Sequence, residues 1–186
     1  MPIIAGLGNI GAEYEGTRHN IGFDIVRRLA ETLSVDLRPG PGPFLCGVGR
    51  HRGKKTILLT PTTYMNNSGK AITKALAYYG VAPEDCLVCC DDINLPTGTI
   101  RMRKNGGSGG HNGLSDIIET IGSTEFPRLR FGIGDNFSRG KQADYVLSPF
   151  PKDEHDHVAV SLHNAHDGAL CFVREGIEQA MNKYNG

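Results

Sequence analysis

The stretch CLVCCDD, from Cys86 to Asp92, decides the fold class of this chain. Its first five residues are apolar without interruption, which is typical of a short β-strand buried on both faces. Strands of this kind belong to parallel sheets that helices cover on both sides. The two aspartates after the apolar run stand at the carboxyl end of the strand, where sheets of this class bind their ligands.

Short apolar runs and helical periodicities alternate on both sides of this strand. The apolar runs predict further strands at Pro2–Leu7, Phe44–Val48, Thr56–Leu59, Thr99–Lys104, Leu129–Ile133 and Tyr145–Leu147, the second and third forming a hairpin. Apolar residues at helical spacing predict helices from Asn20 to Ser34, from an N-capping Ser68 to Gly80, from Leu114 to Ile121, and from Asp153 onward. We therefore expect an α/β fold in a single domain over residues 1–186, with a twisted, mostly parallel or mixed sheet and helices on both faces.

Length, charge and cysteine content limit the class of protein. A chain of 186 residues suits one domain. Its 20 Lys plus Arg against 20 Asp plus Glu exclude a histone-like binder of polyanions, so contact with nucleic acid would need a local basic patch. Five cysteines without a secretory signal indicate a reducing compartment, and no apolar run approaches the ~20 residues of a membrane span. We expect a soluble, cytoplasmic protein that makes no membrane contact.

Two glycine-rich patterns suggest a cofactor but lack its other requirements. Gly6–Gly11 matches the dinucleotide fingerprint G-x-G-x-x-G, yet no helical periodicity opens at its last glycine. Gly106–Gly110 lacks the Lys-Ser/Thr pair of a P-loop, so a phosphate cradle and a flexible hinge stay equal alternatives. We predict no cofactor.

The cysteines and histidines do not give a recognisable metal-ligand spacing. Cys86, Cys89 and Cys90 lie within the apolar strand and are expected to pack as small hydrophobes. His163 and His166 can share a face of the last helix, but we recognise no carboxylate or cysteine that completes a site. We predict a solvated helix face there and no metal.

Three polar clusters adjoin predicted strand ends or helix starts: Thr17–Asn20, Asp91–Asp92 and His111–Asn112. A neutral imidazole takes a proton from water near pH 7, and a carboxylate on its other nitrogen fixes the tautomer, so His19 and Asp91 form a candidate pair. Carboxamides donate and accept hydrogen bonds, and the candidates to hold an amide-bearing substrate are Asn9, Asn66 and Asn112. No nucleophile-elbow motif is present, which favours direct attack by water.

Basic residues recur at strand spacing in two places. Arg101 and Arg103 are two apart on an alternating strand, so both project from one face, and Arg128 and Arg130 repeat the pattern. Such charges are usually the solvated edge of a sheet. Two such arginine pairs in a chain of zero net charge indicate a local basic surface that binds phosphates, which is called the phosphate footprint below.

Five segments, in the family's order and over most of the chain, resemble the bacterial-type peptidyl-tRNA hydrolases. They are GLGNIGAEYEGTRHNIGFD from Gly6, PTTYMNNSG from Pro61, DDINLPTG from Asp91, GGSGGHNGL from Gly106 and FPRLRFGIG from Phe126. The resemblance implies a metal-independent, cofactor-free monomer with a single α/β domain. Such an enzyme hydrolyses the ester between a peptide and the terminal ribose of tRNA, and so recycles tRNA.

The resemblance also implies roles for individual residues. His19 would be the general base, supported by Asp91, and Asn9 would help to distinguish a blocked from a free α-amino group. Substrate would contact Tyr14, Tyr64, Asn66 and Asn112, with Asn112 also near the attacking water or oxyanion. The CCA end and acceptor region of tRNA would face the basic residues Arg101, Arg103 and Arg130.

This sequence departs from the family pattern at three positions: Ile10 replaces a usual Pro, Asn67 a usual Leu and Asn94 a usual Asp. None of them removes a proposed catalytic group, although Asn67 puts the contact at its neighbour Asn66 in doubt. The competing hypothesis is an RNA-binding module on the same scaffold, as in the plant organelle splicing factors that resemble these hydrolases. Retention of Asn9, His19, Asp91 and Asn112 together favours the enzyme.

Overall fold

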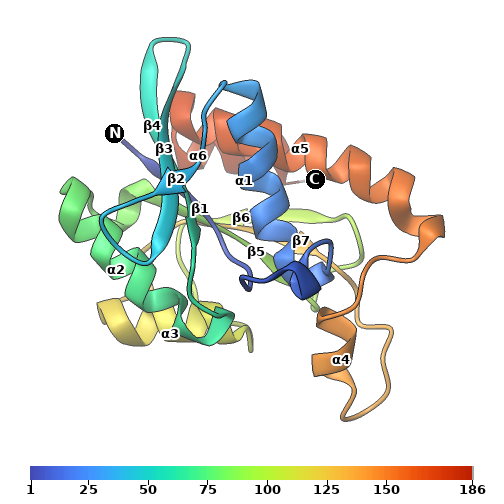
Figure 1. Cartoon of the computed structure of the whole chain (residues 1–186). Coiled ribbons are helices and arrows are strands. Elements are labelled where there is room, and N and C mark those ends of the chain that lie inside the picture. The colour runs from blue at the N-terminus through green and yellow to red at the C-terminus, as the bar shows by residue number, and fades with distance from the viewer. Residues whose placement is uncertain (186) are drawn as a thin grey trace.

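Seven strands form one mixed sheet in the computed structural model, which describes residues 1–185 (Figure 1). The strands are β1 (Ile3–Gly6), β2 (Arg38–Pro39), β3 (Phe44–His51), β4 (Lys54–Pro61), β5 (Cys86–Asp92), β6 (Ile100–Arg103) and β7 (Arg128–Gly132). The helices are α1 (Ile21–Thr32), α2 (Ser68–Tyr79), α3 (Asn112–Ile121), α4 (Gln142–Val146), α5 (His155–Glu175) and α6 (Ile177–Tyr184). The expected α/β class is confirmed, and these residues form a single domain. The predicted domain also included Gly186, which lies outside the described residues.

The sheet is parallel at its centre and antiparallel toward both edges. Its order is β2-β3-β4-β1-β5-β7-β6. β1 pairs in parallel with β4 and β5, and β5 pairs in parallel with β7, whereas the β2–β3, β3–β4 and β6–β7 pairs are antiparallel. The carboxyl ends of β1, β4, β5 and β7 therefore meet at one edge, where ligands of such sheets bind.

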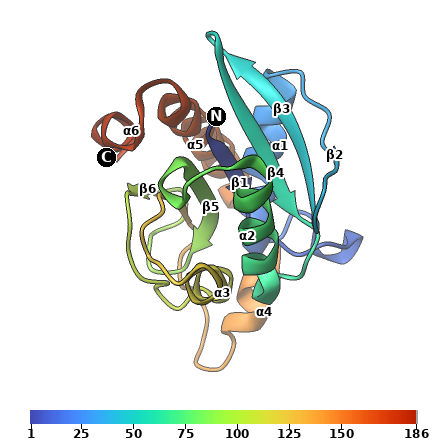
Figure 2. The same ribbon diagram turned by 90° about the vertical axis from the view of Figure 1, so that its left-hand side faces the viewer.

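Each face of the sheet packs on its own apolar core. Alternating side chains such as Ile4, Leu58 and Leu87 face one cluster with residues of α1, α5 and α6. The neighbours Ile3 and Ala5 face a second cluster with residues of α2 and α3. Figures 1 and 2 show α2 and α3 side by side, away from α5 and α6. Because the central strands are covered on both sides, they carry the uninterrupted apolar runs seen in the sequence.

Most predicted elements are confirmed, but Tyr145–Leu147 is not a strand. Backbone bonds from Tyr145 N to Lys141 O and from Leu147 N to Ala143 O make this segment the short helix α4 and its end. Three apolar residues are too few to distinguish a strand from a helix by periodicity. The tail beyond Asp153 is two helices, because Gly176 (φ 87°) interrupts the periodicity.

The predicted N-cap of α2 was wrong by one position. Asn67 occupies the cap, while Ser68 is the first helical residue and its hydroxyl donates to Met65 O at 2.7 Å. The predicted stop at Gly80 is confirmed, with the left-handed φ of 63° that suits glycine.

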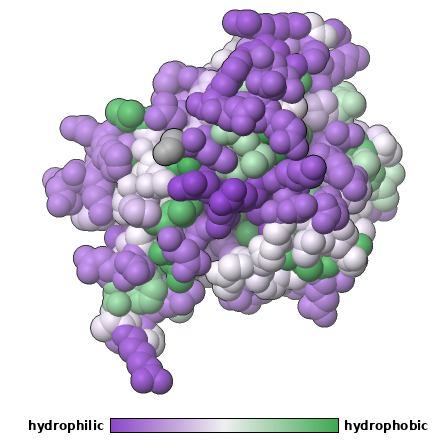
Figure 3. Space-filling model, turned by 180° about the vertical axis from the view of Figure 1, so that it is seen from behind, coloured by the Kyte–Doolittle hydropathy of each residue, from purple (hydrophilic) through white to green (hydrophobic). Residues whose placement is uncertain are grey.

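Among residues 1–185, no helix combines the length and the hydropathy needed to cross a bilayer. Hydrophilic side chains predominate on the face shown in Figure 3, with smaller apolar areas between them.

Candidate active site

A pocket of about 560 Å³ lies at the carboxyl edge of the central strands. Eight of the ten predicted site residues line it: Asn9, Tyr14, His19, Tyr64, Asn66, Asp91, Asn112 and Arg130. They come from the segments after β1 and β4, from the end of β5, from the start of α3 and from β7. Arg101 and Arg103 are not in its lining.

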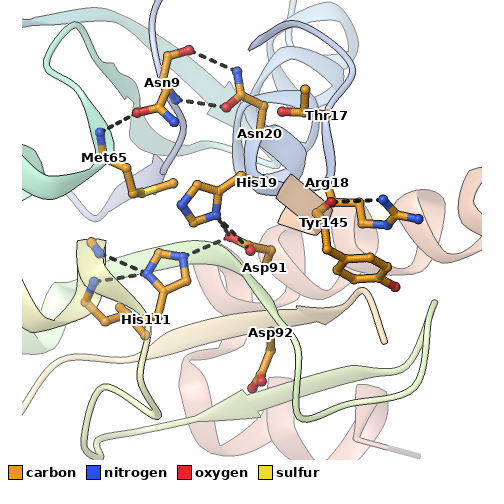
Figure 4. Close-up of polar contacts among 12 residues, drawn as sticks. Asn9, Thr17, Arg18, His19, Asn20, Met65, Asp91, Asp92, His111 and Tyr145 are labelled. Carbon is orange, nitrogen blue, oxygen red and sulfur yellow. Dashed lines mark hydrogen bonds and ion pairs between the residues drawn. The ribbon is translucent and has the colours of Figure 1, made fainter. Parts of the chain in front are cut away.

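His19 and Asp91 are in direct contact, as the sequence predicted. Nδ1 of His19 lies 2.9 Å from both carboxylate oxygens of Asp91 (Figure 4). His19 belongs to a 3-10 turn before α1, and Asp91 is the sixth residue of β5. The second ring nitrogen of His19, Nε2, has no protein partner within residues 1–185 and is the one available to a ligand.

Two glycines set how closely α1, and with it the turn that carries His19, approaches the sheet. A Cβ at Gly22 would lie 2.5 Å from Cys89 O and 2.6 Å from Leu7 N, and a Cβ at Gly6 would overlap Gly22 O. Real Cβ atoms do not approach backbone atoms this closely, so only glycine fits both positions. The missing side chains allow the backbone of α1 to rest directly on β1 and β5.

Buried polar residues on either side of His19 fix its turn. The side chain of Asn20 accepts from Asn9 N at 2.8 Å and donates to Asn9 O at 3.0 Å. The Arg18 guanidinium donates to Tyr145 O at 2.9 Å and lies 3.8 Å from the centroid of the Tyr145 ring. Because these groups are buried and bonded, the ends of the turn are tied to the loop after β1 and to α4.

His111 is a second histidine on Asp91, a contact that the sequence analysis missed. Its Nδ1 accepts from Gly113 N at 3.1 Å and from Leu114 N at 3.2 Å, which caps α3. A nitrogen that accepts backbone N–H groups carries no proton, so the proton of this neutral ring is on Nε2. Nε2 lies 2.8 Å from Asp91 Oδ1 and therefore donates to it. The sequence placed His111–Asn112 among the polar clusters at helix starts, but it offers no sign of the bond from His111 to Asp91.

Asp91 is therefore a buried carboxylate between two imidazoles. Burial disfavours its charged form, but the hydrogen bonds and charge interactions with His111 and His19 outweigh this and hold its pKa well below the usual range. An ionised carboxylate only accepts hydrogen bonds, so the Nδ1 of His19 is the donor. The lone pair of neutral His19 is then on Nε2, directed away from Asp91.

The donor set of this group does not suit a metal ion. The ligand atoms of His19, Asp91 and His111 lie within 4.8 Å of one another. A metal-bound nitrogen must offer a lone pair. His111 uses its lone pair on the backbone of α3 and presents an N–H to Asp91, so binding a metal through Nε2 would require the helix cap to be lost.

Asn9 presents a defined edge of its amide to the pocket. Its Oδ1 accepts from Met65 N at 2.6 Å, which leaves the two Nδ2–H donors available to a ligand. Tyr14 and Tyr64 meet edge to face with centroids 6.3 Å apart. Tyr64 is half exposed, so this aromatic pair forms part of an open wall.

Asn66 and Asn112 are exposed side chains in the lining of the same pocket. Asn67, the departure from the family pattern beside Asn66, lines a separate cavity of about 620 Å³ between α2 and α3. The structure thus places the two neighbouring asparagines on different cavities, with Asn66 on the predicted one.

The four strand arginines have three different environments. Arg101 and Arg130 are register partners in the β6–β7 pair, so their side chains lie beside each other on one face. Arg130 pairs with Asp92 Oδ2 at 2.9 Å in the pocket wall. Arg103 is exposed farther along β6.

Arg128 was wrongly placed in the phosphate footprint. It is 1 % exposed, and its guanidinium donates to the carbonyl oxygens of Gly107, Thr124 and Phe126 at 2.9, 3.1 and 3.3 Å. These carbonyl groups leave it no route to an external phosphate, and it instead anchors one end of the glycine-rich loop. That loop lines the pocket with Ser108–Gly110, and Gly109 O accepts from Asn94 Nδ2 at 3.2 Å.

Comparisons with known proteins give one consistent family. The family model described as peptidyl-tRNA hydrolase matches residues 3–186. The peptidyl-tRNA hydrolase of Lachnospira eligens is 44% identical over 186 residues, with 100% of both chains covered. That of Salinibacter ruber is 45% identical over 180 residues, 97% of this chain and 95% of the relative. The crystal structure of peptidyl-tRNA hydrolase from Acinetobacter baumannii superposes with a TM-score of 0.94 at 37% identity, covering 100% of this chain and 95% of that one.

Proposed function

The chain belongs to the peptidyl-tRNA hydrolase family and hydrolyses peptidyl-tRNA, and we propose that it does so by activating water on His19. The observation that carries this mechanism is the Nδ1 contact of His19 with both oxygens of Asp91 at 2.9 Å. It leaves Nε2 of His19 with a lone pair at the pocket, where a base is needed.

The proposed reaction is direct hydrolysis of the ester. Nε2 of His19 takes a proton from water as the oxygen of that water attacks the ester carbonyl carbon. Asp91 stabilises the imidazolium that forms, and the amide of Asn112 donates to the developing oxyanion. The C–O bond to the terminal ribose of tRNA then breaks, and the ribose hydroxyl receives its proton from His19. The products are free tRNA and a peptide carboxylic acid, which loses its remaining proton to water and leaves as the carboxylate.

We assign the choice of substrate to the loop after β1. The free Nδ2–H donors of Asn9 suit a peptide carbonyl next to the ester, while Tyr14, Tyr64 and Asn66 line the adjoining wall. A free aminoacyl-tRNA would bring an ammonium group, whose desolvation in this pocket is costly. We therefore expect this enzyme to cleave blocked esters and to spare free ones.

The tRNA body is proposed to lie over the basic surface of β6. Arg130 and Arg101 extend from the pocket wall to the edge strand, and Arg103 continues along it. The CCA end would enter the pocket and the acceptor region would cross these side chains. We further propose that the protein is a cytoplasmic monomer that needs no cofactor. We also propose that catalysis needs no metal, because the proton on Nε2 of His111 opposes metal binding at Asp91.

Release of tRNA from N-acetyl-aminoacyl-tRNA tests the mechanism. We expect hydrolysis at an unchanged rate when a chelator of transition metals is added while Mg²⁺ keeps the tRNA folded. Aminoacyl-tRNA with a free amine should be cleaved far more slowly. A rate that falls with the chelator and returns with an added metal would contradict the proposed use of His19 alone.

Arg101 and Arg103 should serve affinity for tRNA and take no part in bond cleavage. Each lost phosphate contact lowers the steepness of the salt dependence by about one unit. Replacing both by Ala should raise KM for full-length substrate several-fold and barely change KM for a blocked aminoacyl ester on a CCA trinucleotide. Equal losses on the two substrates would mean that these arginines support the pocket or the fold.

A further inference from the structure

A second group of two histidines and an aspartate lies outside the pocket, on α5. His163 Nε2 is 3.3 Å from Asp167 Oδ2, and His166 Nδ1 is 2.9 Å from Asp167 Oδ1. The three ligand atoms all lie within 4.8 Å of one another. The carboxylate that was not recognised in the sequence of this face is Asp167, next to His166. The predicted solvated face is also wrong for His166, whose side chain is only 9 % exposed.

We propose that His163, His166 and Asp167 bind a divalent transition-metal ion such as Zn²⁺. With metal–nitrogen and metal–oxygen bonds of about 2.0–2.2 Å, the ligand atoms around one ion lie about 3 to 3.5 Å apart. The contacts of Asp167 with His163 and His166 are already at or close to this spacing. Two imidazoles and one carboxylate on one face suit borderline ions, with water completing the coordination.

His166 also has the outer contact that ligating histidines use. Its Nε2 lies 2.8 Å from Thr32 Oγ1, the last residue of α1. A hydroxyl both donates and accepts, so Nε2 of His166 can carry the ring proton and donate it to Thr32. In the metal-free protein, Nδ1 of His166 donates to Asp167 Oδ1 at 2.9 Å. Binding an ion moves the ring proton to Nε2 and frees the lone pair of Nδ1, while burial holds the ring in place.

The ring proton of His166 can move between its two nitrogens, and this distinguishes the α5 group from the group around Asp91. His111 has its proton fixed on the nitrogen that faces the carboxylate, because the other nitrogen caps α3. His166 has no such restriction. The α5 group is also open to solvent, since the His163 side chain is 63 % exposed and that of Asp167 is 37 % exposed. An ion can therefore enter without any rearrangement of the fold.

Zinc binding to the metal-free protein tests the proposal, measured by calorimetry and by thermal unfolding. The wild-type chain should bind one Zn²⁺ and show a raised Tm. His163→Ala should weaken binding at least tenfold and lose the rise in Tm, because it removes an exposed ligand without disturbing the core. His157→Ala is the matched control: His157 is exposed on the same helix, bonds Thr97 O, and should leave binding unchanged.

A second variant separates this site from the pocket. His19→Ala should still bind Zn²⁺ with the wild-type affinity, since His19 is not among the proposed ligands. Asp167→Asn should weaken binding as His163→Ala does. The proposal is wrong if the wild-type chain binds no Zn²⁺, or if His163→Ala and Asp167→Asn bind it as tightly as the wild type.

Discussion

The group around Asp91 and the group around Asp167 each contain two histidines and one aspartate, but they differ in what surrounds them. In the pocket, the carboxylate is 2 % exposed and receives N–H groups from His19 and His111. On α5, the carboxylate is 37 % exposed, and both of its histidine partners belong to the same helix. The comparison shows that residue type alone does not set the chemistry. Burial and the remaining hydrogen bonds decide which nitrogen carries a proton and which offers a lone pair.

The Asp91 group is also assembled from distant parts of the chain, whereas the α5 group is local. His19 and Asp91 are 72 positions apart, and His111 is 20 positions beyond Asp91. These three residues come together only when the whole sheet and its loops have formed. The α5 residues lie within one turn and a half of a single helix, so they meet wherever that helix forms.

The largest expected difference between the two groups is in catalysis. General-base catalysis contributes about 10²- to 10⁴-fold, so His19→Ala should lower kcat for peptidyl-tRNA by that amount while the protein stays folded. His163→Ala should leave kcat unchanged. The measurement is single-turnover release of tRNA, with circular dichroism of each variant as the control for folding. A near-normal kcat for His19→Ala would overturn the assignment of the base.

His111 should contribute to stability in two ways, through the cap of α3 and through its bond to the buried Asp91. His111→Ala removes a helix cap, which costs about 1 kcal/mol, and a hydrogen bond to a charged group, which costs about 1.5–3 kcal/mol. His111→Asn should restore the cap, because Asn is a preferred capping residue, and should recover only the smaller part. Urea unfolding of both variants gives the two free energies. Equal stabilities for the two variants would mean that the cap contributes nothing.

The pH dependence of stability should distinguish Asp91 from Asp167. The two histidines hold the pKa of Asp91 below the value of about 3.9 in an unfolded chain. A carboxyl group with a lowered pKa stabilises the fold fully above that value, and the contribution is lost as the pH falls toward the folded pKa. Asp91→Asn should therefore be less stable than the wild type at pH 7, and the gap should shrink below about pH 4.

Asp167→Asn is the control for that measurement. Exposed ion pairs contribute about 0–1 kcal/mol, so this variant should differ little from the wild type at any pH. Urea midpoints at pH 7, 4 and 3 give both comparisons. If the gap between Asp91→Asn and the wild type did not change with pH, the charge of Asp91 would not be what its partners stabilise.

The sequence predicted the buried strands from local apolar runs, and the pair His19–Asp91 from polar residues beside a helix start and a strand end. An uninterrupted apolar run at Cys86–Cys90 identifies a central strand, and polar residues after it mark the ligand edge. The five-residue helix α4 was mistaken for a strand because its apolar run is too short to show a period. Local pattern therefore sufficed for long elements and failed for short ones.

Two other contacts between distant segments leave no pattern in the sequence. The period of two on β7 correctly put Arg128 and Arg130 on the same face, but it did not show that the glycine-rich loop covers one of them. The second bond of His111 likewise exists only because α3 starts beside the end of β5. Asp167 is different, since it is adjacent to His166 and its i, i+4 spacing from His163 was visible in the sequence.

The close contact of α1 with the sheet has a consequence for mutational tolerance. Gly6 and Gly22 are not among the residues that line the pocket, yet a single added methyl group at either one would collide with backbone. The helix would have to move outward, and His19 precedes Gly22 by only three residues. A genetic screen for lost activity should therefore recover alanine at these two positions as readily as changes of the base itself, although neither glycine takes part in the reaction.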